Sequence, residues 1–170
     1  MMASKARRSP LVRGLILVVA SALVIALALG AIWLDGLLGI QLPSGLQWPG
    51  MAVLAGGCVL IVWAEVTLLR VVRSTGAFGD PPGTLVAQGP YRHVRNPIYI
   101  AAFGVLLGLS LWRSSPTLFV LALGFLPVIH LFVTRSEEPA TRRRLGAQYD
   151  DYLRRVPRWL PRLNRRVGGV

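Results

Sequence analysis

Four long apolar stretches constrain the fold of this 170-residue chain more than any other feature. Hydrophobic residues make up 54% of the sequence and concentrate in residues 11–34, 50–72, 97–112 and 116–133. A helix rises about 1.5 Å per residue, so about 20 apolar residues cross a hydrocarbon layer of roughly 30 Å. The pattern predicts an all-α integral membrane protein with about four transmembrane helices, organised as a single membrane domain over residues 1–170.

The distribution of basic residues predicts how the chain is oriented. The net charge is +12, and the basic residues gather before the first stretch, between the second and the third, and after the fourth. The positive-inside rule then places both termini and the middle loop in the cytoplasm, as expected of a bacterial inner membrane protein. No helix-turn-helix pattern and no interleaved aromatic residues accompany the arginines, which argues against nucleic acid as a partner.

The first apolar stretch has a second interpretation as a secretory signal. Lys5, Arg7 and Arg8 precede it, and the sequence ALA at residues 26–28 resembles a cleavage site. Signal peptides have apolar cores of about 7 to 15 residues, whereas this stretch continues to Leu34. The length therefore favours a retained helix.

Two polar clusters lie where apolar stretches begin or end. The first is GPYRHVRNPIY, residues 89–99, and the second is RSEE, residues 135–138. Both fall on the predicted cytoplasmic face, so we expect the hairpin between them to bring them together. Glycine and proline in residues 73–95 impose turns on the preceding loop, which is either a solvated linker or a segment that recognises a ligand.

Individual residues of these clusters have structural as well as functional interpretations. Pro97 suits the first turn of a helix, which makes Asn96 a helix cap or a ligand contact. Tyr99 is an interfacial anchor or part of a pocket wall. Glu137 and Glu138 either pair with the abundant arginines or belong to a site. The local sequence does not decide between the two interpretations of any of these residues.

A cytoplasmic amphipathic helix is predicted at the C-terminal side of the fourth stretch. Pro139 is expected to interrupt the helix that carries the two glutamates, and a new helix is expected over residues 140–155. Its apolar side chains share one face with arginines on either side, as in interfacial helices attracted to anionic lipid; they are Leu145, Tyr149, Tyr152 and Leu153.

Other titratable residues are weaker candidates. Glu65 lies within the second apolar stretch, where it either has a function or snorkels toward the cytoplasmic side. His130 lies two helical turns before Glu137, so it lines the same cavity or is a packed core histidine. The single cysteine excludes an intrachain disulfide, and no His/Cys spacing indicates a metal site.

Several short motifs, taken in order, resemble the isoprenylcysteine carboxyl methyltransferase family. They are GTLV (83–86), GPYR (89–92), RNPIY (95–99), EE (137–138), GAQYDDY (146–152) and VPR (156–158). The similarity covers roughly residues 73–163, a methyltransferase-like core. Residues 1–72, with the two N-terminal helices, match only in being hydrophobic.

The resemblance implies a membrane enzyme that transfers a methyl group from S-adenosyl-L-methionine. The substrate would be a lipidic or prenylated small molecule that enters from the bilayer. The family's cofactor contacts, transferred position by position, fall on Gly83, Thr84, Leu85, Val86, Tyr91, Asn96, Pro97, Ile98, Tyr99 and Glu137.

The chain departs from the family pattern at three positions. Asn96 stands where the family commonly has histidine, and asparagine hydrogen-bonds but cannot become an imidazolium. Gly76 replaces a glutamine. Val133 aligns with the arginine that meets the substrate in eukaryotic members, which leaves Arg135 as a displaced candidate, turned by about 200° on a helix.

The catalytic candidates follow from the acceptor chemistry. A carboxylate acceptor is already ionised near neutral pH and needs no base, so Arg95 or Arg135 would hold it. An amine or thiol acceptor needs a base, for which Glu138 or His93 would serve. The resemblance implies a carboxyl O-methyltransferase-like enzyme. A phospholipid N-methyltransferase and a non-enzymatic scaffold that binds anionic lipid remain as alternatives.

Overall fold

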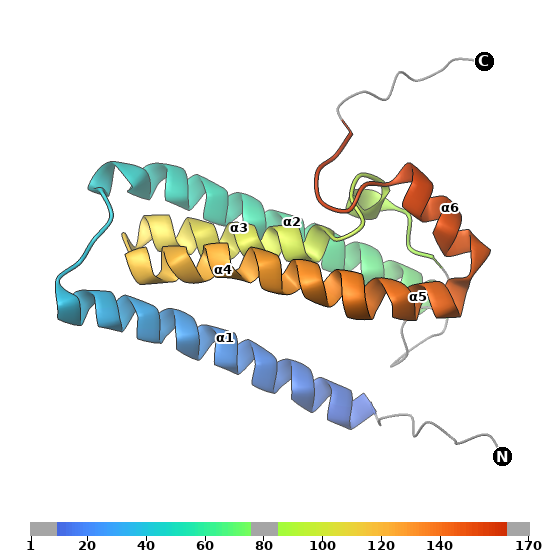
Figure 1. The fold of residues 1–170 in the computed structure, drawn as a ribbon, viewed down its shortest axis with the longest axis horizontal. Coiled ribbons are helices and arrows are strands. Elements are labelled where there is room, and N and C mark those ends of the chain that lie inside the picture. Colours follow the sequence, from blue (N-terminus) through green and yellow to red (C-terminus); the bar gives the residue numbers. More distant parts are fainter. Residues whose placement is uncertain (1–9, 76–84, 163–170) are drawn as a thin grey trace.

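The computed structural model describes residues 10–75 and 85–162, and these residues are helical with no strand. Within these two described ranges, six α-helices follow one another (Figure 1). They are α1 (Pro10–Leu38), α2 (Gln47–Thr75), α3 (Pro97–Trp112), α4 (Pro116–Phe132), α5 (Glu138–Leu145) and α6 (Ala147–Arg155). Short 3₁₀ turns at Ser44–Leu46 and Gly89–Arg92 and a π-helical turn at Val133–Glu137 complete the regular structure. The predicted all-α class is confirmed for these residues.

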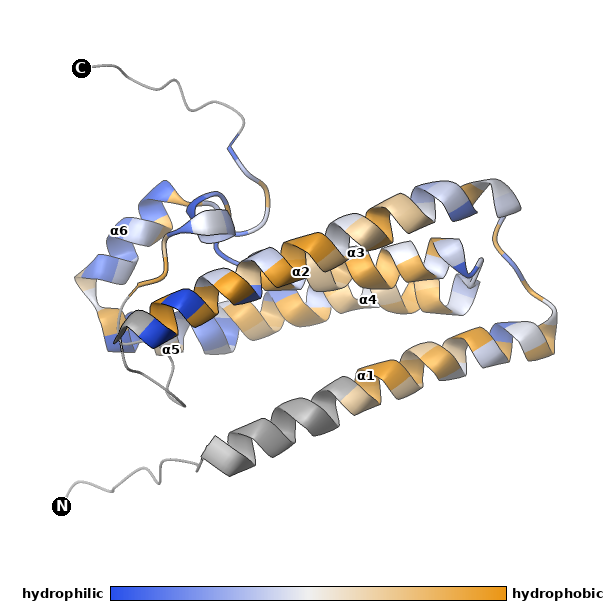
Figure 2. Ribbon diagram, turned by 180° about the vertical axis from the view of Figure 1, so that it is seen from behind, coloured by the Kyte–Doolittle hydropathy of each residue, from blue (hydrophilic) through white to orange (hydrophobic). Residues whose placement is uncertain are grey.

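In the part of the chain that the structure describes, two helical segments are long and apolar enough to cross a membrane, judged by length and composition. They are Ser44–Arg73 and Pro116–Leu145, with 30 residues each. Two further helices are apolar but shorter, namely Ala22–Leu38 within α1 and the whole of α3. The presence of four membrane spans therefore remains a prediction. Apolar residues cover much of the outer surface of the long helices (Figure 2), as expected where lipid replaces water as the neighbour.

Glycine residues bring α2 and α3 into close contact. A Cβ atom added at Gly108 would lie 2.3 Å from the backbone nitrogen of Leu54, and one added at Gly57 would lie 2.8 Å from that of Val105. Small residues of this kind permit the backbone approach that holds helices together in lipid. The pair therefore forms a fixed platform for the polar end of the molecule.

The end of α1 is attached to the start of α4 by polar contacts. The buried carboxylate of Asp35 accepts hydrogen bonds from the hydroxyl groups of Ser115 and Thr117. The hydroxyl oxygen of Ser115 in turn accepts from the backbone N–H of Leu118 at 3.1 Å and so caps α4. These contacts lie at the opposite end of the bundle from the polar clusters (Figure 1).

Pro139 does not interrupt the helix, contrary to expectation. The π-helical turn before it widens the backbone, and the N–H of Glu138 bonds to the carbonyl of Val133. Proline is tolerated at the first positions of α5, where its missing N–H costs little. The predicted single helix over residues 140–155 is instead two helices, because Gly146 adopts a positive φ of 56° between them.

With the polar end of the bundle taken as its top, the start of α3 lies below the ends of its neighbours. α2 and the continuous segment from α4 to α5 both extend beyond Pro97 (Figures 1 and 2). The space above the start of α3 is bordered by residues 85–96 and by α6, which contact each other. The two polar clusters of the sequence meet there.

Candidate functional site

A cavity of about 600 Å³ lies above the start of α3. This volume is in the range of small-molecule sites, which run from roughly 300 to 1,000 Å³. Its wall combines one residue of α2 with residues of the loop, of α3, of the π-helical turn, of α5 and of α6. These are Leu68, Leu85, Val86, Tyr91, Arg95, Asn96, Pro97, Ile98, Tyr99, Glu137, Glu138, Ala140, Thr141, Arg144, Leu145, Tyr149 and Tyr152.

Most of the predicted cofactor positions line this cavity together. They are Leu85, Val86, Tyr91, Asn96, Pro97, Ile98, Tyr99 and Glu137. Gly83 and Thr84 lie outside the described residues, as does Gly76. The hairpin of α3 and α4 accounts for the convergence, because it returns the chain to the same end of the bundle. The role of these cavity-lining residues as cofactor contacts remains a prediction.

Glu137 presents a carboxylate to the cavity without a cationic partner among the described residues. Its Oε1 atom accepts a hydrogen bond of 2.8 Å from the hydroxyl group of Tyr99. Glu137 lies toward the polar end of the 30-residue helical segment Pro116–Leu145, which is about 45 Å long. Because a hydrocarbon layer is roughly 30 Å thick, this polar end lies beyond it. Burial raises the pKa of Glu137, the hydrogen bond from Tyr99 opposes this, and the charge of Glu138 adds to it.

Glu138 is held by two arginines. Its Oε1 atom lies 2.8 Å from Nη1 of Arg95 and 2.8 Å from Nε of Arg158, and its Oε2 atom lies 2.7 Å from Nη2 of Arg158. Burial would raise the pKa of Glu138, but the hydrogen bonds of Arg158 and the charge of Arg95 lower it overall. The two adjacent glutamates thus have opposite pKa shifts, as expected of groups with different roles.

Arg158 was missed as a site residue by the sequence analysis. Its hydrogen bond to Glu138 raises the pKa of its guanidinium group, against the opposing effect of burial. The fork of the guanidinium group fits a carboxylate with two parallel bonds. Arg158 belongs to the VPR motif at residues 156–158, but no local signal indicates its partner, because Glu138 lies 20 residues away at the start of α5.

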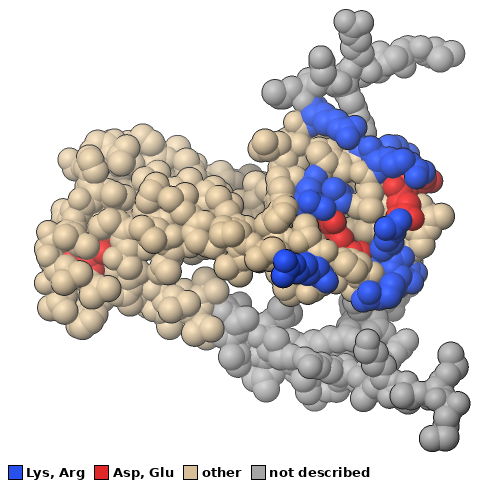
Figure 3. Space-filling model, viewed as in Figure 1, with Lys and Arg blue, Asp and Glu red and all other residues tan. Residues whose placement is uncertain are grey.

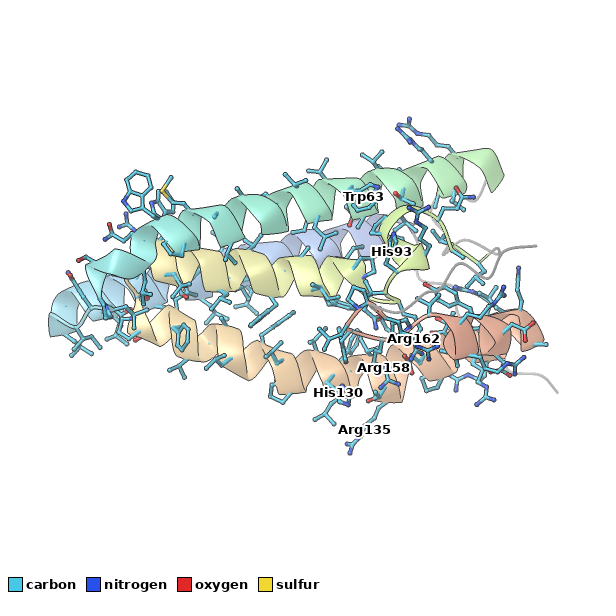
Figure 4. The ribbon with its side chains drawn as sticks, turned by 90° about the horizontal axis from the view of Figure 1, so that it is seen from above. Trp63, His93, His130, Arg135, Arg158 and Arg162 are labelled. Carbon is cyan, nitrogen blue, oxygen red and sulfur yellow. The ribbon has the colours of Figure 1, made fainter. Side chains whose placement is uncertain are left out.

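Arg95 lines the cavity, whereas Arg135 does not, and the role of Arg95 toward an acceptor remains a prediction. The Nε atom of Arg95 is buried and has no hydrogen-bond partner among the described residues, while its Nη1 atom binds Glu138. Arg135 is exposed and projects from the outer side of the long helix, away from the cavity (Figure 4). The π-helical turn and the two-residue offset from Val133 explain this orientation, since Val133 is fully buried.

Tyrosine side chains enclose the cavity from the side of α6. The hydroxyl group of Tyr152 donates a hydrogen bond of 2.6 Å to the carbonyl of Tyr91. Burial, together with the charges of Glu65 and Glu137, raises the pKa of Tyr91 to about 12, so this side chain is neutral at physiological pH. Tyr149 and Tyr152 pack with Val156 against Leu85, Leu145 and Leu153.

This packing corrects the interpretation of the C-terminal amphipathic segment. Its apolar side chains cover the cavity and are not presented to a bilayer surface, because residues 85–91 lie against them. The basic side chains lie on the outside of this end of the molecule, and the remainder of the same face is almost uncharged (Figure 3). α6 therefore forms a wall of the candidate site.

The segment after α6 is joined to the loop before α3. The N–H of Arg95 donates to the carbonyl of Pro157 at 2.9 Å, and Nδ2 of Asn96 donates to the carbonyl of Arg158 at 3.4 Å. Asn96 is the N-cap residue of α3, as one interpretation expected, but its side chain makes no capping hydrogen bond. Its amide instead connects the two chain segments that border the cavity.

The other titratable candidates lie outside the cavity. Glu65 is exposed on α2. His93 is exposed, and its Nε2 atom accepts from Nε of Arg92 at 2.9 Å. His130 is exposed and accepts a hydrogen bond from Trp159. Among the residues that the structure describes, no group of three or more His, Cys, Asp or Glu residues is arranged to hold a metal ion.

Comparison with known proteins gives two matches. The model of a family described as phospholipid methyltransferase matches residues 46–148 and so includes α2. The nickel-cobalt-cadmium resistance protein NccN of Alcaligenes xylosoxydans xylosoxydans is 34% identical over 118 residues, which cover 69% of this chain and 54% of that protein. The alignment thus spans about half the length of this relative. No solved structure matches the chain.

Proposed function

The chain belongs to the phospholipid methyltransferase family, and we propose that it is an S-adenosylmethionine-dependent methyltransferase acting on the carboxylate of a lipidic acceptor at the cytoplasmic face of a membrane. Family membership implies methyltransferase activity, and the two membrane-length helices agree with an integral membrane protein. The observation that carries the proposal is the cavity of about 600 Å³, in which Glu137 faces tyrosine side chains from three elements.

The residues of this cavity fit S-adenosylmethionine. The carboxylate of Glu137 lacks a cationic partner among the described side chains and suits the ribose hydroxyls or the amino group. Tyr91 and Tyr99 provide aromatic surface, which attracts a sulfonium cation. Leu85, Val86 and Ile98 would cover the apolar parts of the cofactor. Bound there, S-adenosylmethionine supplies an electrophilic methyl group.

The chain's own contribution is positioning. The contacts among the loop, α5 and the segment after α6 hold the cavity walls in place without the ligand. Fixed orientation of two reactants supplies up to roughly 7 to 11 kcal/mol of the barrier reduction.

A carboxylate acceptor agrees with the state of the two glutamates. Glu138 is bound by two arginines and Glu137 by the hydroxyl of Tyr99, so neither is positioned as an unengaged base. Arg95 lines the cavity while its Nη1 atom binds Glu138, and its guanidinium charge would attract an anionic acceptor group. Methyl transfer to an ionised carboxylate requires no proton removal.

A phospholipid amine is the second candidate acceptor. The family description favours it, and the raised pKa of Glu137 makes this carboxyl a better base than an exposed glutamate. The two acceptors differ in the product, because a methyl ester is cleaved by mild base and a methylated amine is not.

The test is methyl transfer by the purified chain in bilayers. The protein is incubated with lipid extract and S-adenosylmethionine labelled with tritium in its methyl group, and the lipid product is then treated with base. Label released as volatile methanol supports the ester, and label that stays non-volatile on the headgroup nitrogen identifies the amine instead. Absence of cofactor binding by folded protein would leave the membrane scaffold as the function.

A further inference from the structure

Arg135 of the second polar cluster and the nearby His130 play no part in the cavity. Arg135 and His130 are both exposed and project from the same outer side of the long helix that contains α4 (Figure 4). No carboxylate among the described residues pairs with Arg135. Both side chains are therefore accessible to a partner outside the cavity.

The segment after α6 brings an aromatic side chain to this place. The Nε1–H of Trp159 donates a hydrogen bond of 3.2 Å to Nδ1 of His130, and the centres of the two rings lie 6.2 Å apart. Since Nδ1 accepts this bond, a neutral His130 carries its hydrogen on Nε2 and presents it as a donor. Leu160 follows Trp159 and is 80% exposed.

The position of this group along α4 corresponds to a membrane boundary. α4 has 17 residues from Pro116 to Phe132, a length of about 26 Å, so its end approaches the limit of a hydrocarbon layer of roughly 30 Å. Exposed apolar side chains continue along the outer surface of α4 below His130, among them Leu123 and Leu126. Tryptophan prefers this depth, where its ring meets acyl chains and its N–H meets polar groups.

We propose that Arg135, His130, Trp159 and Leu160 form a membrane-interface site for the headgroup of an anionic phospholipid. The guanidinium group of Arg135 and the Nε2–H of His130 bind the phosphate oxygens, while Trp159 and Leu160 enter the region between headgroups and acyl chains. The site is separate from the cavity and does not depend on the methyl-transfer reaction. It also anchors the segment whose Arg158 holds Glu138, so the bilayer stabilises one wall of the cavity.

The test measures lipid contact at Trp159 in the full chain. A variant retaining only this tryptophan, with Trp33, Trp48, Trp63 and Trp112 replaced by phenylalanine, is placed in phosphatidylcholine nanodiscs with or without phosphatidylglycerol. One lipid at a time carries bromine atoms near the headgroup, and quenching of fluorescence is recorded. We expect stronger quenching by brominated phosphatidylglycerol than by brominated phosphatidylcholine, and we expect Arg135→Gln to remove this preference.

Arg143→Gln is the matched control, because Arg143 is an exposed arginine of α5 and lies outside the proposed site. A second measurement avoids the multiple substitutions: native mass spectrometry of the otherwise unaltered chain compares retained phosphatidylglycerol. Arg135→Gln should reduce its affinity about fivefold, the effect of one arginine near an anionic surface, and Arg143→Gln should reduce it less. Unquenched Trp159, or equal effects of the two arginine variants in both measurements, would overturn the proposal.

Discussion

The hydroxyl group of Tyr99 lies 2.8 Å from Oε1 of Glu137, although 38 residues separate them along the chain. Tyr99 stands in the first turn of α3 and Glu137 in the π-helical turn after α4, so the hairpin of two apolar helices creates this contact. The adjacent Glu138 turns toward two arginines instead. The carboxylate of Glu137 thus remains available to a ligand, whereas that of Glu138 connects the walls of the cavity.

Glu137→Gln is predicted to weaken the binding of S-adenosylhomocysteine without unfolding the protein. The amide is similar in shape but loses the charge that serves the ligand, and a hydrogen bond to a charged group contributes about 1.5 to 3 kcal/mol. We therefore expect roughly 10- to 100-fold weaker binding by calorimetry. Tyr99→Phe removes only the neutral hydroxyl group and should have a smaller effect. Equal affinity of wild type and Glu137→Gln would exclude this carboxylate as a cofactor contact.

Arg158→Gln and Glu138→Gln are predicted to destabilise the same structure. Each removes one partner of a charge-assisted pair with bonds of 2.7 and 2.8 Å, which we expect to cost about 1.5 to 3 kcal/mol. Because both changes remove the same contact, the double variant should be less destabilised than the sum of the single variants. Thermal unfolding in detergent measures this. Strict additivity would show that the pair is not coupled in solution.

The pH dependence of stability should change in Glu138→Gln. The pKa of Glu138 is lowered in the folded chain relative to its ordinary value of 4.5. Its ionised form is therefore favoured by folding, so its stabilisation is present above about pH 4.5 and is lost as the pH falls through the lower folded-state value. Melting temperatures across this acidic range should fall less steeply in the variant than in wild type. Parallel curves would contradict the assigned shift.

Gly108→Ala is predicted to disrupt the packing of α2 on α3, whereas Gly104→Ala is not. The added Cβ would lie 2.3 Å from a backbone atom of Leu54 at position 108, but at position 104 its nearest neighbour, the Cα of Gly57, lies 3.5 Å away. Overpacking of this kind costs about 1 to 3 kcal/mol. The difference should appear as a lower melting temperature of the first variant alone. Similar melting temperatures would indicate that the two helices are less closely packed.

The apolar pattern of the sequence predicts much of the architecture. The bounds of α3 agree with the prediction because Pro97 and the Arg113–Ser115 turn mark its ends, and Asn96 takes the predicted N-cap position. The convergence of the two polar clusters follows from the hairpin alone. These features depend on local signals or on chain connectivity, which a single sequence contains.

The features that the sequence did not predict depend on contacts between distant segments. Pro139 was expected to break a helix, but the π-helical turn accommodates it. The apolar face of α6 was assigned to the bilayer, because periodicity shows that a face is apolar without showing what covers it. Arg158 was overlooked because its partner Glu138 lies 20 residues away, and Arg135 was included because the orientation after the π-helical turn could not be known.

Photo-crosslinking tests most directly whether the cavity above α3 binds S-adenosylmethionine. The purified full chain in nanodiscs is irradiated with the cofactor labelled with tritium in its methyl group, and labelled peptides are identified by mass spectrometry. We expect saturable labelling within residues 85–99 or 137–152, reduced by excess S-adenosylhomocysteine and by Glu137→Gln. Labelling confined to the groove of α2 lined by Cys58, Trp63 and Arg70, or no saturable labelling of folded protein, would contradict this expectation.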